Sequence, residues 1–532
     1  MDKIIGFQSG HDVSYCVLEN GIPTIHEELE RFSREKNSLG DGLKMFYEHY
    51  NGKKDNLKYF SFGNFSGRSG QWENDCKIPY FDGLMRKTVA KNKGEFFELS
   101  HHMCHAANAF FSSNYKSSLI ITIDGGGNES LNETTACTIY KGHKNSISKL
   151  KVFPINNLNI GLAWDFITQS FGLSIGHPKG HQAGTVMAMA GLSECEKYVD
   201  PIIDIIQMKK VSGNEAIENT KKIFEKNHSN QKVQFDIARS LQIATELVIK
   251  DIISDALKLH PSKNLCLAGG CALNSVMVGK IKSWFPQIEN IYVPPVPTDA
   301  GLAIGSAQYV WHQIFKKDRI NWKDNFTPYL GKKYTNSEIM DSLKDYDSLV
   351  RLKEVDDNDV IELLNNQKII SIFGKGSESG RRALGNRSIL ADPRSENMKK
   401  TINDKVKHRQ WFRPFAPSII QDEVKNWFTL NEESPYMSMV LKWKRNKGKI
   451  VPAVNHFDNS ARLQTVTEND NPWYFNFLQK WKNKTQVPIL LNTSFNDSEP
   501  IVETPKHAIN CFLKTNIDYI YFHQNNTLVS KQ

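Results

Sequence analysis

The chain has 532 residues, of which 39% are hydrophobic and 23% are charged. This length suits two or three domains, and the composition is typical of a globular protein rather than of a disordered or fibrous one. The 67 Lys and Arg residues outnumber the 58 Asp and Glu residues, which gives a formal net charge of +9. A basic surface favours anionic ligands such as nucleotides, phosphates or a polynucleotide, and the charge alone does not choose among them.

The sequence predicts neither a targeting segment nor disulfides. No apolar run reaches the about 18 residues of a membrane-spanning helix, and the start, MDKIIGFQSG, lacks the features of a signal peptide. We therefore expect a cytoplasmic protein without membrane contact. The eight cysteines form neither a disulfide framework nor a CxxC zinc pattern, which predicts reduced thiols.

The chain opens with strand and turn signals. Residues 4–7, 15–18 and 22–25 are predicted to be strands of a β-meander. His11 and Asp12 lie in the turn between the first two strands, where side chains can reach a ligand. For Asp12, a solvated turn is an equal alternative.

Residues 100–128 carry the most informative pattern. Ser100 is a candidate N-cap of an Ala-rich helix, and the helical period places His101 and His105 on one face as a metal clip. Residues 118–123 are predicted to be a strand that ends in Asp124 and three glycines, which suits a metal and a nucleotide together. A His-rich surface helix followed by a tight turn is the alternative for the His pair alone.

Later segments extend this site. Residues 265–270 are predicted to be a strand that leads through two glycines into a helix with free N–H groups. Residues 291–293 repeat the pattern, so Asp299 becomes a fourth donor if the strands are neighbours. Two His and two Asp suit iron, manganese or zinc better than a thiolate metal. Cys104 faces another direction on its helix and is expected to pack.

Two other segments have helical spacing. Residues 27–36, EELERFSREK, mix both charge signs, which is typical of a solvated face, and by this pattern Lys36 is an ordinary surface residue. Residues 236–259 are predicted to be a long amphipathic scaffold helix. A second HxxxH occurs at residues 177–181, but Pro178 makes a helix improbable, so we expect a substrate loop rather than a metal site.

A domain boundary is predicted near Gly331. Beyond it, a strand at residues 369–373 runs into a Gly-rich loop that lacks P-loop spacing. This loop is predicted to be an anion cradle, with cations at Lys375, Arg381, Arg382 and Arg387. Residues 405–417 add Arg409 and Arg413, and Arg462 and the NTSFN segment at 492–496 follow apparent strands.

These motifs together resemble the NodU/CmcH family of ATP-dependent carbamoyltransferases, whose members include tobramycin carbamoyltransferase. The resemblance covers nearly the whole chain, through GHDVS, ERFSREK, HHMCHAANAF, IDGGGN, GGCALN, PTDAGLAIG, GRRALGNRSILADPR, FRPFAPS, ARLQTV and LNTSFN in the family's order. It implies an α/β protein of two domains. Residues 1–330 would form a sugar-kinase/actin-like (ASKHA) domain, as in tRNA threonylcarbamoyladenosine transferase, and residues 331–532 a YrdC-like domain.

The resemblance also implies two linked reactions. Carbamoyl phosphate and ATP, with Mg²⁺, would form carbamoyl adenylate in the YrdC-like domain, and an acceptor hydroxyl would take the carbamoyl group in the first domain. It assigns catalytic roles to His11 and Lys36, and a metal, with iron preferred, to His101, His105, Asp124 and Asp299. It assigns nucleotide contacts to Asp12, Gly125, Gly126, Gly270 and Asn274, and the carbamoyl phosphate or adenylate to Arg382, Arg413, Arg462, Asn492 and Ser494.

The chain departs from the family pattern in two places. The family reads G-P-R where this chain has Gly380-Arg381-Arg382, so a charge replaces a rigid residue. A family lysine is absent from residues 184–190, which affects acceptor or nucleotide contacts there.

The acceptor stays open between a natural product or sugar and a 5-hydroxymethyl-pyrimidine nucleotide or nucleic acid. Residues 442–449 and 480–484 place tryptophans among lysines, a mix that can bind a polynucleotide, although a solvated lysine-rich surface is the alternative. A tRNA threonylcarbamoyl transferase-like enzyme and a catalytically silent nucleotide-binding regulator are rival interpretations. A homodimer is compatible with all of them.

Overall fold

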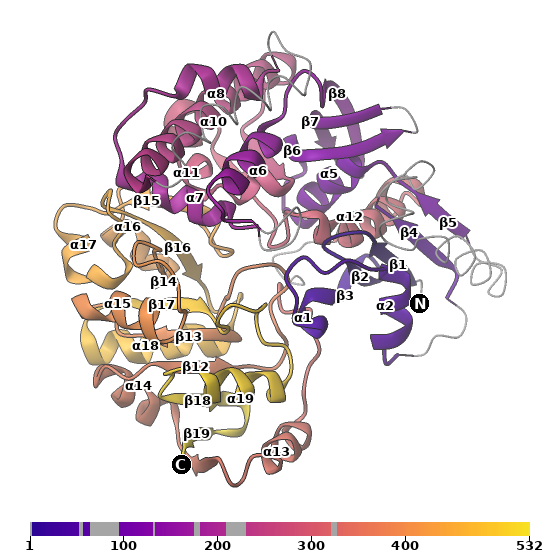
Figure 1. The fold of residues 1–532 in the computed structure, drawn as a ribbon. Coiled ribbons are helices and arrows are strands. Elements are labelled where there is room, and N and C mark those ends of the chain that lie inside the picture. The colour runs from indigo at the N-terminus through magenta and orange to yellow at the C-terminus, as the bar shows by residue number, and fades with distance from the viewer. Residues whose placement is uncertain are drawn as a thin grey trace. The chain divides into compact units, whose positions relative to one another are not determined.

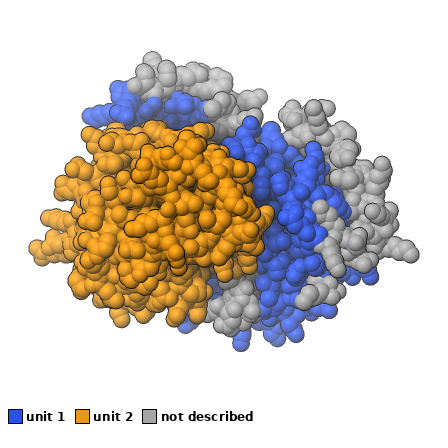
Figure 2. Space-filling view, turned by 90° about the horizontal axis from the view of Figure 1, so that it is seen from below, with its two compact units in different colours: residues 1–326 blue, residues 327–532 orange. Residues whose placement is uncertain are grey.

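The computed structural model describes residues 3–52, 57–63, 95–130, 133–174, 181–208, 230–320 and 327–532. The protein is a mixed α/β chain that divides into two compact units, unit 1 at residues 1–326 and unit 2 at residues 327–532 (Figure 2). The predicted α/β class is confirmed. The assignment of separate activities to the two parts stays a prediction.

The first sheet of unit 1 has the strand order β3-β2-β1-β4-β5, formed by Lys3–Gln8 (β1), Ser14–Glu19 (β2), Ile22–Glu28 (β3), Tyr59–Phe62 (β4) and Glu95–Glu98 (β5) (Figure 1). The first three strands are antiparallel neighbours, which confirms the predicted meander. Asn20 and Gly21 turn the chain between β2 and β3 with positive φ angles of 51° and 84°. Such angles match the twist of a tight hairpin.

The second sheet has the order β10-β9-β6-β7-β8, formed by Ser117–Ser130 (β6), Glu133–His143 (β7), Ser146–Pro154 (β8), Asn264–Ala268 (β9) and Asn290–Tyr292 (β10). The prediction that β6 ends at Asp124 is wrong, because the strand continues to Ser130. Its register on β7 shifts between Ile123 and Gly127. Asp124 therefore lies in a bulge within a long strand, and bulges commonly redirect a side chain at a site.

Two helices pack between these sheets, His101–Ser112 (α5) and Leu302–Tyr309 (α12) (Figure 1). A Cβ on Gly6 of β1 would lie 1.9 Å from the carbonyl oxygen of Ala303, and a Cβ on Gly305 would lie 1.9 Å from that of Cys104. The small residues thus let α12 approach a strand on one side and α5 on the other. Cys104 is fully buried, as expected for a packing residue.

The remaining helices of unit 1 are Leu29–Ser33 (α1), Gly42–His49 (α2), Ile160–Ser170 (α6), Ala183–Met189 (α7), Val199–Ile206 (α8), Gln231–Leu259 (α10) and Ser275–Trp284 (α11), with short turns at Ala190–Leu192, Gly270–Leu273 and Asp299–Gly301 and a π-helical turn at Val310–Ile314. The long amphipathic helix is confirmed as α10. It begins at Gln231 and packs against α7, α8 and α11 (Figure 1).

The solvated helix predicted at residues 27–36 is wrong. Only α1 is helical there, and Arg31 is 3% exposed. The carboxylate of Glu27 is buried and accepts a 2.6 Å hydrogen bond from the Tyr15 hydroxyl. Charge alternation did not reveal that these charges face the interior.

Unit 2 contains a nine-stranded mixed sheet with the order β11-β19-β18-β12-β13-β17-β14-β16-β15 (Figure 1). Its strands are Val350–Glu354 (β11), Ile370–Phe373 (β12), Arg387–Ala391 (β13), Ala416–Ile420 (β14), Met439–Lys442 (β15), Ser460–Val466 (β16), Ile489–Ser494 (β17), Tyr519–Phe522 (β18) and Thr527–Lys531 (β19). The helices are Asn336–Lys344 (α13), Asp357–Asn365 (α14), Glu396–Lys405 (α15), Val424–Trp427 (α16), Lys447–Ile450 (α17), Pro472–Thr485 (α18) and Pro505–Lys514 (α19), with short turns at Gln421–Glu423, Pro452–Val454 and His523–Asn525.

The core of unit 2 lies between this sheet and the helices α14 and α18. Leu490 of β17 and Val466 of β16 point into that core. Because side chains alternate along a strand, Asn492, Arg462 and Ser494 belong to the same sheet face as these core residues. The site residues of unit 2 are therefore continuous with its core.

The tryptophans that suggested polynucleotide binding are buried. Trp443 is 3% exposed and stacks on Phe428 at 4.2 Å, and Trp481 is fully buried and donates to the Ile489 carbonyl. Lys480 pairs with Asp357 at 2.8 Å. The prediction that the tryptophans at residues 442–449 and 480–484 stack on bases is wrong, because both rings are packed in the interior. Within the described ranges, no helix has the length and hydropathy needed to cross a membrane.

Candidate functional site

The four predicted metal ligands of unit 1 lie together. His101 and His105 come from the first two turns of α5, Asp124 from the bulge in β6, and Asp299 from the turn before α12. One donor atom from each lies within 4.8 Å of the others. His105 Nε2 lies 3.4 Å from both Asp124 Oδ2 and Asp299 Oδ1, and 3.1 Å from His101 Nε2.

The start of α5 is held by a residue that sequence reasoning missed. Ser100 occupies the N-cap position, but its hydroxyl makes no capping bond. Instead, the His102 N–H donates to Glu129 Oε1 at 3.0 Å, and Lys149 pairs with Glu129 Oε2 at 2.7 Å. The Glu129 side chain is fully buried. Its sequence position on β6 carried no signal, because the contact joins a strand to a helix start 27 residues earlier.

Backbone groups orient the carboxylate of Asp124. Its two oxygens accept hydrogen bonds of 2.6 Å from the N–H groups of Gly125 and Gly270. Gly269 has a φ of +90°, and a Cβ there would lie 2.1 Å from the Ile123 carbonyl oxygen. The glycine in the β6 bulge and the glycines after β9 thus bring two backbone segments to one carboxylate.

The predicted nucleotide contacts have mixed environments. Gly125 is exposed beside the Asp124 carboxylate, and Gly126 is half-buried. The Asn274 side chain is engaged inside the unit, since its Oδ1 accepts from the Met277 N–H at 3.1 Å and caps α11, and its Nδ2 donates to Gln242. Gly127, not predicted as a site residue, lies against the His101 ring, and a Cβ there would be 2.2 Å from that ring.

His11 borders the cluster, whereas Lys36 lies on the exposed turn after α1. His11 Nε2 is 3.4 Å from Asp299 Oδ2, and its Nδ1 is 3.8 Å from Asp12 Oδ2. Asp12 has a φ of 52°, which directs the turn back toward β2. The role of Lys36 stays a prediction.

Charges of opposite sign dominate this cluster. Burial alone lowers the pKa of His11 and of His105, but neighbouring carboxylates, Asp12 and Asp299 for His11, Asp124 and Asp299 for His105, raise both pKa values to about 9. Burial raises the pKa of Asp299, and the imidazoles outweigh it and hold that pKa well below its usual range. The carboxylates are therefore ionised at neutral pH.

The donor set fits a divalent or trivalent cation. Two imidazoles and two carboxylates converge without any Lys or Arg paired to them in the described residues. The Nδ1 atoms of His101 and His105 are buried without a hydrogen-bond partner, so both rings present Nε2 to the cluster. Such a mixed nitrogen and oxygen set suits iron, manganese or zinc.

A second cluster, in unit 2, contains cations only. Arg382 follows Gly380 in the Gly-rich loop, Arg413 precedes β14, and Arg462 lies on β16. None of the three has a carboxylate ion pair in the part of the chain that the structure describes. Burial, together with Arg462 and Arg413, lowers the pKa of Arg382 well below its usual value. Burial and the neighbouring arginines lower the pKa of Arg462 to about 10.

The Gly-rich loop is shaped by Glu378 and Arg387, both buried. Glu378 Oε1 accepts from the N–H groups of Leu384 (2.7 Å) and Arg387 (3.0 Å). Arg387 donates to the Gly374 carbonyl at 2.6 Å and lies 3.5 Å from the Phe373 ring centroid. Its prediction as part of the anion cradle is wrong, because its guanidinium is used to close the loop.

Asn492 and Ser494 project from β17 on the sheet face of Arg462. Asn492 is 1% exposed, and its Nδ2 donates to the Ala383 carbonyl at 3.1 Å and to Gln464 Oε1 at 2.8 Å. Its Oδ1 is buried without a partner. Lys407, which sequence reasoning missed, donates to Ser494 Oγ at 3.2 Å from an almost fully buried position.

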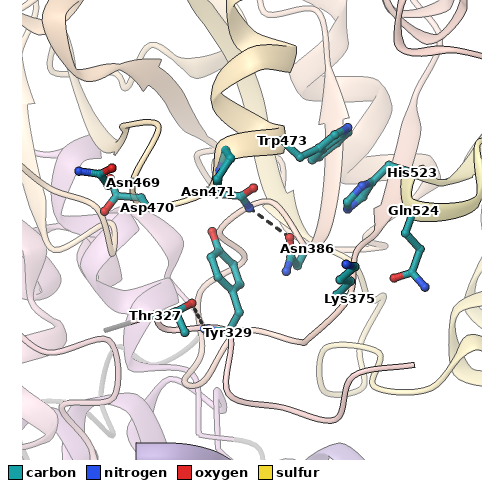
Figure 3. A pocket seen from close by; sticks show the side chains of 11 residues that line it. Thr327, Tyr329, Lys375, Asn386, Asn469, Asp470, Asn471, Trp473, His523 and Gln524 are labelled. Atoms are coloured by element: carbon teal, nitrogen blue, oxygen red, sulfur yellow. Dashed lines mark hydrogen bonds between the residues drawn. The ribbon is translucent and has the colours of Figure 1, made fainter. Parts of the chain in front are cut away.

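Unit 2 also has a pocket of about 570 Å³ at the end of α18 (Figure 3). Trp473 stacks on His523 at 3.9 Å, and Asn471 donates to Asn386 at 3.1 Å across its wall (Figure 3). Lys375 lines this pocket, and Arg382 is not among the lining residues. The joint role of these two residues in one anion cradle stays a prediction.

The loop predicted at residues 177–181 lies outside the described residues up to position 180. His181, which is described, pairs with Asp165 of α6 at 3.0 Å. The substrate-loop interpretation stays a prediction.

Comparisons with known proteins cover most of the chain. The family model "Carbamoyltransferase N-terminus" matches residues 43–308, and "Carbamoyltransferase C-terminus" matches residues 361–531. Nodulation protein NolO of Bradyrhizobium diazoefficiens is 31% identical, over 79% of this chain and 77% of its own. An uncharacterised protein of Synechocystis sp. is 30% identical, over 98% of this chain and 95% of its own.

Among solved structures, the crystal structure of T. kodakarensis HypF aligns with a TM-score of 0.34 and 13% identity, covering 57% of this chain and 47% of HypF. That likeness is too distant to support a conclusion about this fold. The two family models, by contrast, match residues 43–308 and 361–531, and the NolO relative matches 79% of the chain. The chain belongs to the NodU/CmcH family of carbamoyltransferases.

Proposed function

We propose that the protein is an O-carbamoyltransferase that activates carbamoyl phosphate with ATP and transfers the carbamoyl group to the hydroxyl of a small molecule. In this proposal unit 2 acts as a YrdC-like activating domain, and unit 1 as an ASKHA-type transfer domain. The single observation that carries it is the grouping of Arg382, Arg413 and Arg462, which have no ion pair with a carboxylate among the described residues. Arginines that depress one another's pKa favour a bound anion, which relieves their repulsion.

The activation step uses two anionic substrates in unit 2. Overall, carbamoyl phosphate, ATP and water give carbamoyl adenylate, orthophosphate and pyrophosphate. Loss of the phosphate leaves carbamate, whose oxygen attacks the α-phosphorus of ATP while the bond to the β-phosphate breaks. The arginines would hold the phosphates and offset the charge that develops on the transferring group. ATP enters as its Mg²⁺ complex.

Asn492 and Ser494 would position the carbamoyl end. The Nδ2 of Asn492 is held by Gln464 and the loop carbonyl of Ala383, which leaves Oδ1 without a partner. An amide oxygen fixed in this way suits the N–H of a carbamoyl group. Lys407 holds Ser494 in place.

The transfer step would occur at the cluster of unit 1. There the acceptor oxygen forms a bond to the carbamoyl carbon, the bond to AMP breaks, and the hydroxyl proton leaves to a base. His101, His105, Asp124 and Asp299 would hold the metal, for which we propose iron, and such a cation polarises the carbamoyl oxygen and the acceptor hydroxyl. Gly125, Gly126 and Gly270 would contact the adenylate, with Asp12 and Asn274 as the further predicted contacts.

His11 is the proposed base for the acceptor hydroxyl. Its pKa of about 9 means that it carries a proton at neutral pH while Asp299 and Asp12 dominate its surroundings. Asp299 is also a proposed metal ligand, and a bound cation would offset its charge and lower the pKa of His11. His11 would therefore act as the base only when the metal is bound. Lys36 is proposed to contact the carbamoyl group or its phosphate.

The test is isotope exchange followed by mass spectrometry. Pyrophosphate should exchange into ATP only when carbamoyl phosphate is present, and AMP should accumulate only when an acceptor alcohol is added. A panel of sugars, polyhydroxylated natural products and hydroxymethyl-pyrimidine nucleosides and DNA would identify the acceptor by a gain of one carbamoyl group. Exchange that requires threonine and bicarbonate instead, or no exchange at all, would overturn the proposal.

A further inference from the structure

Two aromatic rings in unit 2 lie next to each other and are exposed. Trp411 is 54% exposed and Phe457 is 53% exposed, and their ring centroids are 5.6 Å apart at an interplanar angle of 82°. Of the tryptophans and phenylalanines that the structure describes, these two are the exposed ones. Aromatic side chains of this size are normally buried, so an exposed pair marks a surface that contacts something else.

The two rings stand on loops that lie close in sequence to two members of the arginine cluster, Arg413 and Arg462. Trp411 lies in the loop before β14, between Arg409 and Arg413. Phe457 lies in the loop before β16, five residues ahead of Arg462. Because β14 and β16 are parallel neighbours, both loops enter the same edge of the sheet. The aromatic pair therefore lies on the rim of the sheet where Arg413 leads into β14 and where β16, with Arg462 as its third residue, begins.

The loop of Trp411 is fixed rather than loose. Asn403 of α15 donates from Nδ2 to the carbonyl of Trp411 at 3.2 Å and to that of Arg413 at 3.0 Å, and its Oδ1 accepts from Arg409 Nε at 2.8 Å. One buried amide thus fixes the backbone at Trp411 and Arg413 and holds the guanidinium of Arg409. Lys399 Nζ lies 4.2 Å from the Phe457 ring centroid and extends the cationic rim.

A ligand for this rim has to combine a phosphate with a planar ring. Carbamoyl phosphate has no ring, whereas a nucleotide has both parts. We infer that Trp411 and Phe457 bind the purine base of the ATP whose phosphates are held by Arg413 and Arg462. This inference rests on the proposed function, since it assigns the base subsite of the activation step. A purine stacks on one ring while the perpendicular ring closes its edge.

The test uses the full chain and measures separately how much the base and the phosphates of ATP contribute to binding. The first readout is the KM for ATP in carbamoyl phosphate-dependent pyrophosphate exchange, and the second is the inhibition constant of tripolyphosphate, which lacks a base. Trp411→Ala and Phe457→Ala should each raise the KM for ATP about fivefold to a hundredfold, the range expected for loss of one stacking contact. Neither should change inhibition by tripolyphosphate, and Trp411→Phe should restore most of the affinity.

Two further variants serve as references. Leu349→Ala removes another exposed apolar side chain of unit 2, 49% exposed, and should change neither constant. Arg413→Ala should weaken both ATP and tripolyphosphate, because it removes a phosphate contact. Circular dichroism establishes that each variant is folded.

The outcomes separate the inference from the function on which it rests. If the unmodified chain shows no carbamoyl phosphate-dependent exchange, the proposed function fails and the base subsite fails with it. If exchange occurs and Trp411→Ala leaves the KM for ATP unchanged, the base subsite alone is wrong. A change confined to the oligomeric state, seen by light scattering, would make the pair a contact between copies of the chain and would likewise overturn the inference.

Discussion

The two charged clusters differ in how they are neutralised. In unit 1, His105 and Asp299 hold each other's charges, so each raises or lowers the other's pKa in the direction that favours ionisation. In unit 2, Arg382 and Arg462 have arginine neighbours and, in the part of the chain that the structure describes, no carboxylate ion pair. Burial and these neighbours lower the pKa of both. A balanced cluster is stable without a ligand, whereas an unbalanced one stores repulsion that an anion releases.

The largest effect should come from breaking the balanced cluster. Asp299→Asn removes the carboxylate that contacts His11, His101 and His105. We expect carbamoyl transfer to the acceptor to fall about a thousandfold or more and bound metal to fall with it, since each ligand is needed for a tight site. Metal content by mass spectrometry and the transfer rate are the measurements, with exchange of pyrophosphate into ATP retained.

Asp318→Asn removes an exposed carboxylate from the same unit and serves as the control for a lost carboxylate. If Asp299→Asn abolishes the exchange as strongly as the transfer, the division of labour between the two units is wrong.

The second effect concerns the unbalanced cluster. Arg462→Ala should lower the exchange rate about a hundredfold, because a cation that stabilises developing charge is lost. The same variant should leave the melting temperature of the free protein unchanged or higher, since it also removes repulsion from Arg409 and Arg413. Calorimetry without ligand checks this sign.

Arg445→Ala is the matched control, because Arg445 is exposed on the turn before α17 and should affect neither quantity. A large loss of stability in Arg462→Ala would mean that this arginine supports the fold rather than an anion.

Carbamoyl phosphate should distinguish the two clusters by which of them its binding stabilises. Carbamoyl phosphate at ten times its Kd should stabilise the protein by about 1.4 kcal/mol, the mass-action value for one site. The gain should disappear in Arg413→Ala and persist in Asp299→Asn. Differential scanning calorimetry at several ligand concentrations tests it, and equal stabilisation of all three proteins would place the anion elsewhere.

The smallest effect should come from Glu129, which holds the start of α5. Burial raises the pKa of this carboxyl, but His102 and Lys149 lower it by more, so the pKa lies below its usual value. A lowered pKa contributes stability that is present above the ordinary pKa of a glutamate and is lost as the pH falls through the folded value. Glu129→Gln should therefore cost about 1 kcal/mol at pH 7, and this difference should shrink as the pH falls below about 4.

Denaturant unfolding at pH 7 and at a pH below about 4 measures the difference in stability between Glu129→Gln and the unmodified chain. Glu133→Gln, an exposed acid on the neighbouring strand β7, is the control and should show no pH-dependent difference. A Glu129 effect that stayed constant across this range would mean that shape, not charge, holds the helix start.

Local patterns predicted much of the cluster in unit 1. The spacing of His101 and His105 is a helix property. Asp124 lies in β6 and Asp299 follows β10, and these two strands belong to one sheet. The prediction that failed, the end of the strand at Asp124, also came from a local pattern. The β6 strand continues past Asp124 because β7 keeps pairing with it, and no feature of residues 124–130 alone reports that partner.

In unit 2 the sequence predicted which residue types gather near the site, but it did not predict which way their side chains point. Arg382 and Arg387 lie in the same loop, yet one joins the cation cluster and the other turns inward onto Phe373. Trp443 and Trp481 lie among lysines in the sequence, but their rings fill the core while the lysines stay outside. Sequence proximity to charge does not report which way a ring points.

By itself, the sequence determined the α/β class, the family and the residue types that the two clusters contain, because these depend on periodicity and on the order of motifs along the chain. The tertiary structure alone decided which charges face each other, which arginine is structural, and that Glu129 and Lys407 support the sites. The physical reason is range: hydrogen bonds and ion pairs act over a few ångströms in space, and residues that are distant in sequence come that close only after the sheets have formed.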